Sequence, residues 1–448
     1  MIQKERVTTL NHNLAVHGKY VIFWMQASQR TEYNHALQFA IRQANENNIP
    51  IIVYFGLTDS FPEANKRHYY FMLEGLIDVA KSLAELGIKM VIEHKSPDRG
   101  ILLFAKQASM VICDRGYLNI QRRWRSDVAK NIKCPFIQVE TDIVVPVEEA
   151  SSKEEYSAAT FRPKIMKQLP KYLKALENHK PKIESIEYDY PSIDISSIDN
   201  TLADLKMDQT VTEVDFLHGG TSKAKQHLQQ FIKHKLFSYS KDRNDPNENC
   251  ISNMSPYLHF GQISPLYIAL QVLNKSPLSE NYLEEMIVRR ELSINYVFYN
   301  KRYDSFLGLP EWARNSLQKH ERDTRKYVYS GIDFEKASTH DQYWNATQTE
   351  MVKTGKMHGY MRMYWGKKIL EWCNNPEEAF KIALYLNNKY EIDGRDANGY
   401  TGVAWCFGKH DRPWANRAIF GNIRYMNANG LKRKFDVDAY VDRIKGIS

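Results

Sequence analysis

The sequence is poor in cysteine and lacks the signals of several common protein classes. Its 448 residues include only five cysteines, which are widely scattered and form no CxxC pair. This pattern predicts neither a metal site nor a disulfide framework, and it fits a reducing compartment. No apolar run approaches the roughly 18 residues of a membrane span, and the first residues lack the apolar core of a signal peptide. We therefore expect an intracellular protein, cytoplasmic or nuclear, that has no contact with a membrane.

Nucleotide-binding loops are also missing. No GxGxxG and no Walker motif occurs, which argues against a standard dinucleotide or nucleoside-triphosphate site. The sequence is instead rich in flat and basic side chains, with 27 Tyr, 8 Trp and a formal net charge of +8. Flat rings suit stacking on bases or on a planar cofactor, and positive charge suits a polyanionic partner.

The periodicity of the chain changes along its length. Residues 1–145 alternate between buried-strand and amphipathic-helix patterns, which predicts a doubly wound α/β domain around a parallel sheet. Residues 146–221 are charged and Ser-rich, as in a connecting segment. Residues 222–448 have a helical pattern almost throughout, which predicts an all-α domain. The expected strands are Tyr20–Trp24, Ile49–Phe55, Ile88–Glu93, Met110–Cys113 and Pro135–Val139.

Helices are expected in both domains. Three of them separate the strands of the first domain: Tyr33–Asn47, His68–Leu86 and Ile120–Asn131. The second domain is expected to contain Ser222–Leu236, Pro265–Leu273, Tyr282–Tyr299, Trp312–Tyr327, Asp341–Lys353, His358–Trp372, Pro376–Lys389 and Asp436–Ile444.

The segment His358–Trp372 is the most informative of these. Trp365 and Trp372 are two helical turns apart on one face, so their backbones are separated by a rise of roughly 10 Å. Arg362 and Met363 lie at the start of the same surface. Periodicity alone is equally typical of a Trp-rich core helix, so the function of this helix depends on its neighbours in the chain.

Two other segments combine charge with apolar or capping residues. Glu285 and Arg289 are four residues apart beside apolar neighbours, so they form either a solvated ion pair or a site for a polar ligand with a phosphate. Ser252, Asn253 and Ser255 precede a helical pattern, which is typical of an ordinary N-cap or of an anion site.

The last two segments are polar. Residues 387–402 are turn-rich, and there Asp393 could pair with Arg362 while the amide of Asn387 could donate or accept. The stretch Lys409–Arg417, with Arg424 beyond it, is basic and contains Trp, as in a nucleic-acid contact or a solvated loop.

Together these segments resemble the photolyase/cryptochrome family, most closely its class II cyclobutane pyrimidine dimer (CPD) photolyases. The resemblance spans nearly the whole chain. It is carried, in this order, by Trp24-Met-Gln-Ala-Ser-Gln-Arg-Thr-Glu-Tyr-Asn-His-Ala36, Asn253-Met-Ser-Pro-Tyr-Leu-His-Phe-Gly-Gln-Ile-Ser264, Glu284-Glu-Met-Ile-Val-Arg-Arg-Glu291, Met357–Trp372 and Asp393-Gly-Arg-Asp396.

The resemblance implies an FAD in the helical domain and a DNA substrate. By this resemblance, Arg362 pairs with Asp393 beside the flavin ring and Asn387 lies near flavin N5. The other residues that it assigns to the flavin are Tyr239, Ile251, Ser252, Asn253, Met254, Ser255 and Arg289. It assigns Arg243, Asn244, Arg412 and Arg424 to the opened DNA strand, and Met363 and Trp405 to the flipped bases.

The same resemblance implies a light-driven mechanism. An electron passes from excited reduced FAD to a flipped-out dimer, and Glu285 stabilises the dimer that has received it. Trp365, Trp344 and Trp372 form an electron route from the surface to the flavin, with Trp344 bridging the other two. The α/β domain would house an antenna chromophore, which could be an 8-hydroxy-deazaflavin or a folate, or its pocket could be empty.

Three other functions fit parts of this pattern. A cryptochrome-like light receptor would signal through a partner, but such proteins often carry a long tail, and this chain ends at Ser448, soon after its last expected helix. A (6-4) photoproduct photolyase needs an active-site His pair, for which only His259 and His358 are candidates. A non-photochemical flavoprotein or a plain nucleic-acid-binding module would not need the Trp array. We therefore expect a monomeric enzyme that repairs pyrimidine dimers in DNA.

Overall fold

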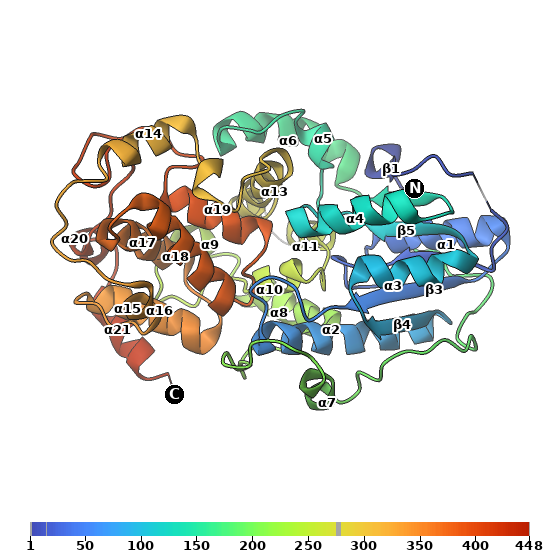
Figure 1. The fold of residues 1–448 in the computed structure, drawn as a ribbon. Helices are drawn as coiled ribbons and strands as arrows, with labels where there is room; N and C mark the ends of the chain where they lie inside the picture. Colours follow the sequence, from blue (N-terminus) through green and yellow to red (C-terminus); the bar gives the residue numbers. More distant parts are fainter. Residues whose placement is uncertain (1, 15, 275–278, 448) are drawn as a thin grey trace.

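The chain folds into an α/β domain and a helical domain that lie side by side (Figure 1). The computed structural model describes residues 2–14, 16–274 and 279–447, so residues 1 and 448, the outer ends of the two expected domains, lie outside it. The N-terminal segment lies on the α/β side, and the chain ends at the opposite side, beyond the last helix of the helical domain.

The α/β domain is built on one sheet with the strand order β1-β6-β5-β2-β3-β4. Strands β2 to β6 pair in parallel, and only the edge strand β1 is antiparallel. The central strands β2 and β3 are buried along their full length, because Val, Ile and aromatic residues face helices on both sides. The strands are β1 Val7–Thr9, β2 Tyr20–Trp24, β3 Ile51–Leu57, β4 Lys89–His94, β5 Ala108–Asp114 and β6 Phe136–Val139.

Helices cover both faces of this sheet, which confirms the doubly wound α/β prediction. Side chains of α1 (His35–Asn47) and α2 (Lys66–Glu85) share one apolar cluster with the sheet. Side chains of α3 (Pro97–Phe104) and α4 (Asn119–Asn131) share another cluster, on the opposite face. The sequence patterns indicated every strand and helix of this domain except β1 and α3, which are short.

Residues 146–221 are more structured than a simple linker. They contain α5 (Val147–Ala150), α6 (Ala158–Tyr172) and α7 (Ile198–Ala203). Helix α6 buries Phe161 and Ile165 against residues of the helical domain, so this segment is part of the packed molecule.

The helical domain contains the remaining elements, and its main core surrounds Trp344, Trp365 and Trp372. Most expected helices are present, but the one expected at Trp312–Tyr327 ends at Lys319, and residues 397–406, part of which looked turn-rich, form a helix. The α-helices are α8 Thr221–His234, α9 Tyr239–Asp242, α10 Ser255–His259, α11 Pro265–Leu273, α12 Glu280–Leu283, α13 Arg290–Tyr299, α14 Glu311–Lys319, α15 Gly331–Glu335, α16 Gln342–Thr354, α17 Gly359–Trp372, α18 Pro376–Tyr390, α19 Ala397–Cys406, α20 Ala428–Lys432 and α21 Val437–Lys445. Three 3₁₀ turns complete the described elements: η1 Lys4–Arg6, η2 Ala105–Gln107 and η5 Phe306–Gly308.

One irregular segment interrupts the helix that spans residues 280–299. Between α12 and α13, residues Glu284–Arg289 form a π-helix, η4. Such segments are rare and are frequent at functional sites, because the wider turn changes which side chains share a face.

Candidate functional site

Three tryptophans form a continuous stack inside the helical domain. The rings of Trp344 and Trp365 lie parallel, with centroids 6.4 Å apart and planes 6° apart. The ring of Trp372 lies 6.2 Å from that of Trp344, at an angle of 66°. Trp344, from α16, thus bridges the two tryptophans of α17, as expected from the sequence. All three side chains are buried.

Hydrogen bonds fix the orientation of the two inner rings. The indole N–H of Trp365 donates to Gln348 Oε1 over 2.9 Å, and that of Trp344 donates to the backbone C=O of Trp365 over 3.0 Å. Helix α16 begins at a defined residue, because the Asp341 carboxylate accepts the backbone N–H groups of Tyr343 and Trp344. The two inner rings are therefore held in a fixed orientation.

A cluster of buried charges lies near the start of α17. We expected Arg362 to pair with Asp393, and this detail is wrong. Arg362 donates to Glu391 Oε1 over 2.8 Å, whereas Asp393 pairs with Lys356 over 3.2 Å. Lys356 Nζ also lies 2.5 Å from Ser255 Oγ, at the start of α10.

The two acids of this cluster differ in protonation. Burial raises the pKa of Glu391 to about 8, although Arg362 opposes the shift. Burial also acts on Asp393, but Lys356 and Arg362 outweigh it and hold the pKa of that carboxyl well below its usual range. The pKa values of the two acids are therefore shifted in opposite directions, and the cations Lys356 and Arg362 stabilise the ionised form of Asp393.

Unpartnered buried atoms indicate that this cluster is built for a polar ligand. Within the described residues, Arg362 Nε, Asp393 Oδ1, Glu391 Oε2 and Gln348 Nε2 are buried without a hydrogen-bond partner. Such atoms are costly unless a ligand or water satisfies them.

The other residues assigned to the flavin surround α9 and α10. Tyr239 is buried and packs edge-on against Tyr282. Asn253 adopts a left-handed backbone with φ of 55°, directly before the α10 turn. Asn387 is buried in α18, not in a loop, and donates to Asn388 Oδ1 over 3.3 Å. Ile251 and Ser252 are half-buried, while Met254 is buried.

The π-helix pairs its charges differently from a simple i, i+4 arrangement. Glu285 forms an ion pair with Arg243 over 2.7 Å. Arg289 instead pairs with Glu284 over 3.2 Å, and Glu284 also binds Arg162 of α6 over 2.6 Å. Of the two possibilities that the sequence left open, a mutual ion pair between Glu285 and Arg289 is therefore not formed.

Arg289 also contacts an aromatic side chain. Its guanidinium carbon lies 5.3 Å from the ring centroid of Trp405, on α19. Glu285, Arg289, Trp405 and Met363 are all half-buried, so their polar atoms and rings remain accessible to a ligand. Met363 Sδ lies 3.9 Å from Cys406 Sγ, the residue next to Trp405.

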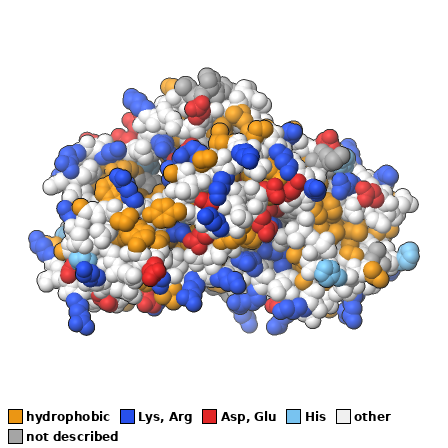
Figure 2. All heavy atoms as spheres, turned by 90° about the horizontal axis from the view of Figure 1, so that it is seen from above, with side chains coloured by type: hydrophobic (Ala, Val, Ile, Leu, Met, Phe, Trp, Pro, Cys, Tyr) orange, Lys and Arg blue, Asp and Glu red, His pale blue; other side chains and the backbone are white. Residues whose placement is uncertain are grey.

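The basic loop after α19 is exposed. Arg412 precedes Trp414 in this loop and Arg424 follows it. Their guanidinium carbons lie 5.7 Å and 5.1 Å from the ring centroid of Trp414. Trp414 is 40% exposed, and Asn244 is also exposed. Figure 2 shows Lys and Arg side chains spread over the face seen from above and denser along its lower margin. These features suit a polyanion.

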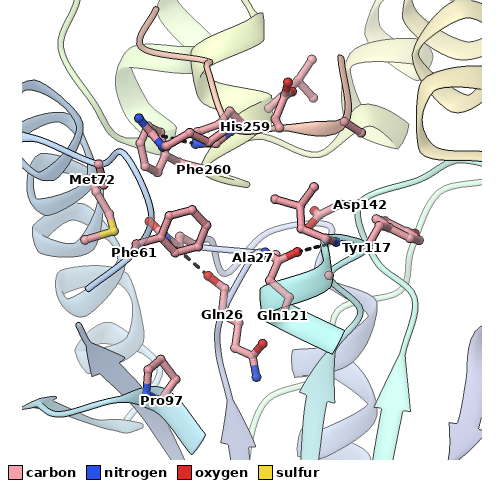
Figure 3. A pocket seen from close by; sticks show the side chains of 18 of the residues that line it. Gln26, Ala27, Phe61, Met72, Pro97, Tyr117, Gln121, Asp142, His259 and Phe260 are labelled. Atoms are coloured by element: carbon pink, nitrogen blue, oxygen red, sulfur yellow. Dashed lines mark hydrogen bonds between the residues drawn. The ribbon is translucent and has the colours of Figure 1, made fainter. Parts of the chain in front are cut away.

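A second candidate site lies between the two domains. A cavity of about 170 Å³ opens at the carboxyl ends of the parallel strands, which is where doubly wound domains bind ligands. Figure 3 shows side chains of the α/β domain, such as Gln26, Phe61 and Tyr117, facing His259 and Phe260 from the helical domain. Gln26 Nε2 and Oε1 are buried there without a partner among the described residues.

Several contacting residues were not predicted from the sequence. Lys356 and Glu391 carry charges of the buried cluster, Gln348 orients Trp365, and Glu284 holds Arg289. Two of these residues could have been noticed in the sequence, because Lys356 lies just before the His358 segment and Glu391 lies just before Asp393. Nothing in the sequence of α16 singled out Gln348, because tertiary packing alone brings it next to the indole of Trp365.

Comparisons with known proteins agree with this architecture. Residues 21–182 match the family model described as DNA photolyase. The deoxyribodipyrimidine photo-lyase of Methanothermobacter thermautotrophicus is 53% identical and covers 100% of this chain and 99% of its own length. That of Arabidopsis thaliana is 43% identical, covering 95% of this chain and 89% of its own length.

Solved structures share the fold at low sequence identity. A class III photolyase from Agrobacterium tumefaciens aligns with a TM-score of 0.72 and 18% identity, over 96% of this chain and 87% of that one. A Sulfolobus tokodaii photolyase with two FAD molecules aligns with the same score and identity, over 95% of this chain and 89% of that one. No helix in the described part of the chain is long and apolar enough to cross a membrane. Because its relatives are this similar over nearly their whole length, the chain belongs to the DNA photolyase family of enzymes, the family that its motifs resemble.

Proposed function

We propose that the chain is a class II CPD photolyase, which uses light to split cyclobutane pyrimidine dimers in DNA. The observation that carries this proposal is the buried stack Trp365–Trp344–Trp372 close to a cationic cluster. A stack of oxidisable rings conducts electrons, whereas a DNA-binding module or a thermal flavoprotein has no need of one.

FAD is the cofactor that fits the cationic cluster. When bound, it supplies light absorption and an excited reduced state that can donate an electron. Arg362 would hold it through its unpartnered Nε, with Lys356 and Asn387 as further polar contacts, and the two cations suit a cofactor whose reduced form is anionic. Tyr239 and the segment 251–255 would bind its remaining parts.

The half-buried residues around η4 would bind the flipped dimer. Glu285 would hydrogen-bond the dimer and stabilise the charge it acquires, because a preorganised partner is most effective where charge develops. Met363 and Trp405 would pack on the bases. Arg243, Asn244, Arg412 and Arg424 would hold the opened strand through its phosphates.

The pair Arg243–Glu285 adds a step to this binding. Arg243 Nη1 and Glu285 Oε1 form an ion pair over 2.7 Å. When DNA binds, Arg243 would exchange this carboxylate for a phosphate, which would leave Glu285 free to bind the dimer.

The cavity between the domains would hold the antenna chromophore. Its walls are mostly apolar, with the polar edge atoms of Gln26 and Arg395 Nε left unpartnered among the described residues. A flat ring with polar edges, such as an 8-hydroxy-deazaflavin or a folate, fits this lining. The absorbance spectrum of the purified protein would identify it, and Met72→Trp, which fills the cavity, should remove that absorbance but leave the flavin bands.

The (6-4) alternative gains no support from its two candidate histidines. His259 lines the cavity between the domains, whereas His358 caps α17 through the N–H of Tyr360. Burial lowers the pKa of His259 to about 3 and that of His358 to about 4, so neither is a ready proton donor near neutral pH.

The test of this function is light-dependent repair of a defined thymine dimer. Purified protein with chemically reduced flavin should split the dimer into two thymines under near-ultraviolet or blue light and not in the dark. Protein without bound flavin, or reduced protein that leaves the dimer intact in the light, would reject the proposal.

A further inference from the structure

The outermost tryptophan of the stack has a paired lysine next to its ring. Lys368, one turn before Trp372 on α17, places its Nζ 5.5 Å from the centroid of the Trp372 ring. The same Nζ donates to Glu371 Oε2 over 2.5 Å. The Lys368 side chain is only 7% exposed, so this pair is largely shielded from solvent. In the described residues, neither Trp344 nor Trp365 has a comparable cation over its ring.

A cation near an indole ring changes how easily the ring loses an electron. The neutral ring attracts the cation through its π face, but a ring that has lost an electron is positive and repels it. Lys368 alone would therefore make Trp372 harder to oxidise. The Glu371 carboxylate, bound directly to the ammonium group, cancels most of this effect.

Other charges near Trp372 do not replace Glu371. Trp372, Lys368 and Glu371 line a cavity of about 470 Å³ together with His340, Asp341 and Lys326. Burial lowers the pKa of His340, which leaves that ring uncharged at neutral pH. Asp341 accepts backbone N–H groups of α16 and the hydroxyl of Tyr364, so its charge stays fixed in place whatever residues stand at positions 368 and 371. Lys326 is exposed and screened by water.

We propose that the Lys368–Glu371 pair sets how readily Trp372 gives up an electron, with Glu371 favouring the loss and Lys368 opposing it. This inference rests on the proposed electron route. In that route, one electron leaves Trp372 for an oxidised Trp344, and an added thiol refills Trp372 and is itself oxidised. The pair is thus a tuning device at the solvent end of the stack, and it touches neither DNA nor the cationic cluster.

The pair can be tested through the oxidation of Trp372 itself. An uncharged dye that absorbs red light, which the flavin does not absorb, serves as a one-electron oxidant for the holoenzyme. Mass spectrometry then measures the oxidised fraction of Trp372. Glu371→Gln should lower this fraction about tenfold and Lys368→Met should raise it about threefold, because the first leaves an uncompensated cation and the second removes it.

Further variants separate charge from structure. The double variant Lys368→Met/Glu371→Gln has neither charge and should return close to wild type, and Lys368→Arg should match wild type. Lys381→Met removes the lysine of an exposed ion pair with Glu377 on α18 and should change nothing. Melting temperatures check that every variant is folded.

Two outcomes would overturn the inference. Either the two single variants shift the oxidised fraction in the same direction, or neither differs from wild type. Since the measurement uses neither DNA nor repair, its failure would leave the dimer-repair proposal standing, and failure of repair would leave this measurement valid.

Discussion

The tryptophan stack and the surface around η4 differ in the interactions that fix their side chains. The three indoles are buried in packed surroundings, and hydrogen bonds to groups that do not titrate near neutral pH orient those of Trp344 and Trp365. Glu285 and Arg289 are half-exposed and fixed by ion pairs that another anion or cation can replace. Electron transfer needs rings whose separation stays constant, whereas DNA binding needs charged groups that can exchange partners.

The largest expected effect comes from breaking the stack at its inner end. Trp365→Phe should slow photoreduction of oxidised flavin by about two orders of magnitude, since phenylalanine is far harder to oxidise than tryptophan. Flash spectroscopy measures this rate, and Trp312→Phe, outside the stack, is the control. Photoreduction at full speed in the Trp365 variant would remove this residue from the route.

The next effect concerns the carboxylate at the exposed surface. Glu285→Ala should lower the yield of repair about tenfold, because a charge-assisted hydrogen bond to the dimer is lost. Affinity for dimer-containing DNA should stay equal or rise slightly, because Arg243 is released from its partner. Repair yield and binding are measured on the same oligonucleotide, and an unchanged yield would contradict the assigned role.

A variant of Arg289 tests whether this residue contacts the cofactor or the DNA. Arg289 contacts Trp405, which is proposed to pack on the bases, whereas the family resemblance assigned Arg289 to the flavin. Arg289→Gln should weaken DNA binding about threefold and reduce the salt dependence by about one charge, with flavin content unchanged. Loss of flavin with normal DNA binding would restore the original assignment. Arg412→Gln is the matched variant on the exposed loop.

The effect furthest from the reaction itself concerns stability at the contact between the domains. Burial raises the pKa of Glu291 to about 8, although it accepts the N–H of Val144 over 2.6 Å. Because the folded-state value exceeds the unfolded value near 4.5, this contribution is complete at low pH and is lost as pH rises through about 8. Wild type should therefore lose about 4 kcal/mol of stability between pH 5 and 9 relative to Glu291→Gln, as measured by urea unfolding. Parallel pH curves would show that Glu291 ionises as freely in the fold as in water.

Sequence patterns predicted elements better than partners. Strand β2 and helix α11 were found at their observed bounds, because apolar runs and an N-terminal proline are local signals. Helix α19 was missed, since Gly399 and Gly402 suggest a turn. Tertiary packing overrides that propensity, and Asp396 caps the helix by accepting the N–H of Gly399.

Sequence patterns also failed to predict which charged residues pair within the site. Glu391 and Asp393 are two residues apart after α18, and both could reach Arg362 in principle. Which carboxylate does so depends on where Lys356 lies, and Lys356 comes from a different part of the chain. The same holds for Arg289, whose partner changed because a π-helical turn shifted its face.

The most direct test of the account uses Trp344→Phe, which removes the middle ring of the stack. Two quantities are measured on one preparation: photoreduction of oxidised flavin, and repair of a defined thymine dimer after chemical reduction. The account predicts that the first is lost and the second stays at the wild-type rate, because the route supplies electrons and the η4 surface uses them. Loss of both, or retention of both, would contradict the separation of these two regions.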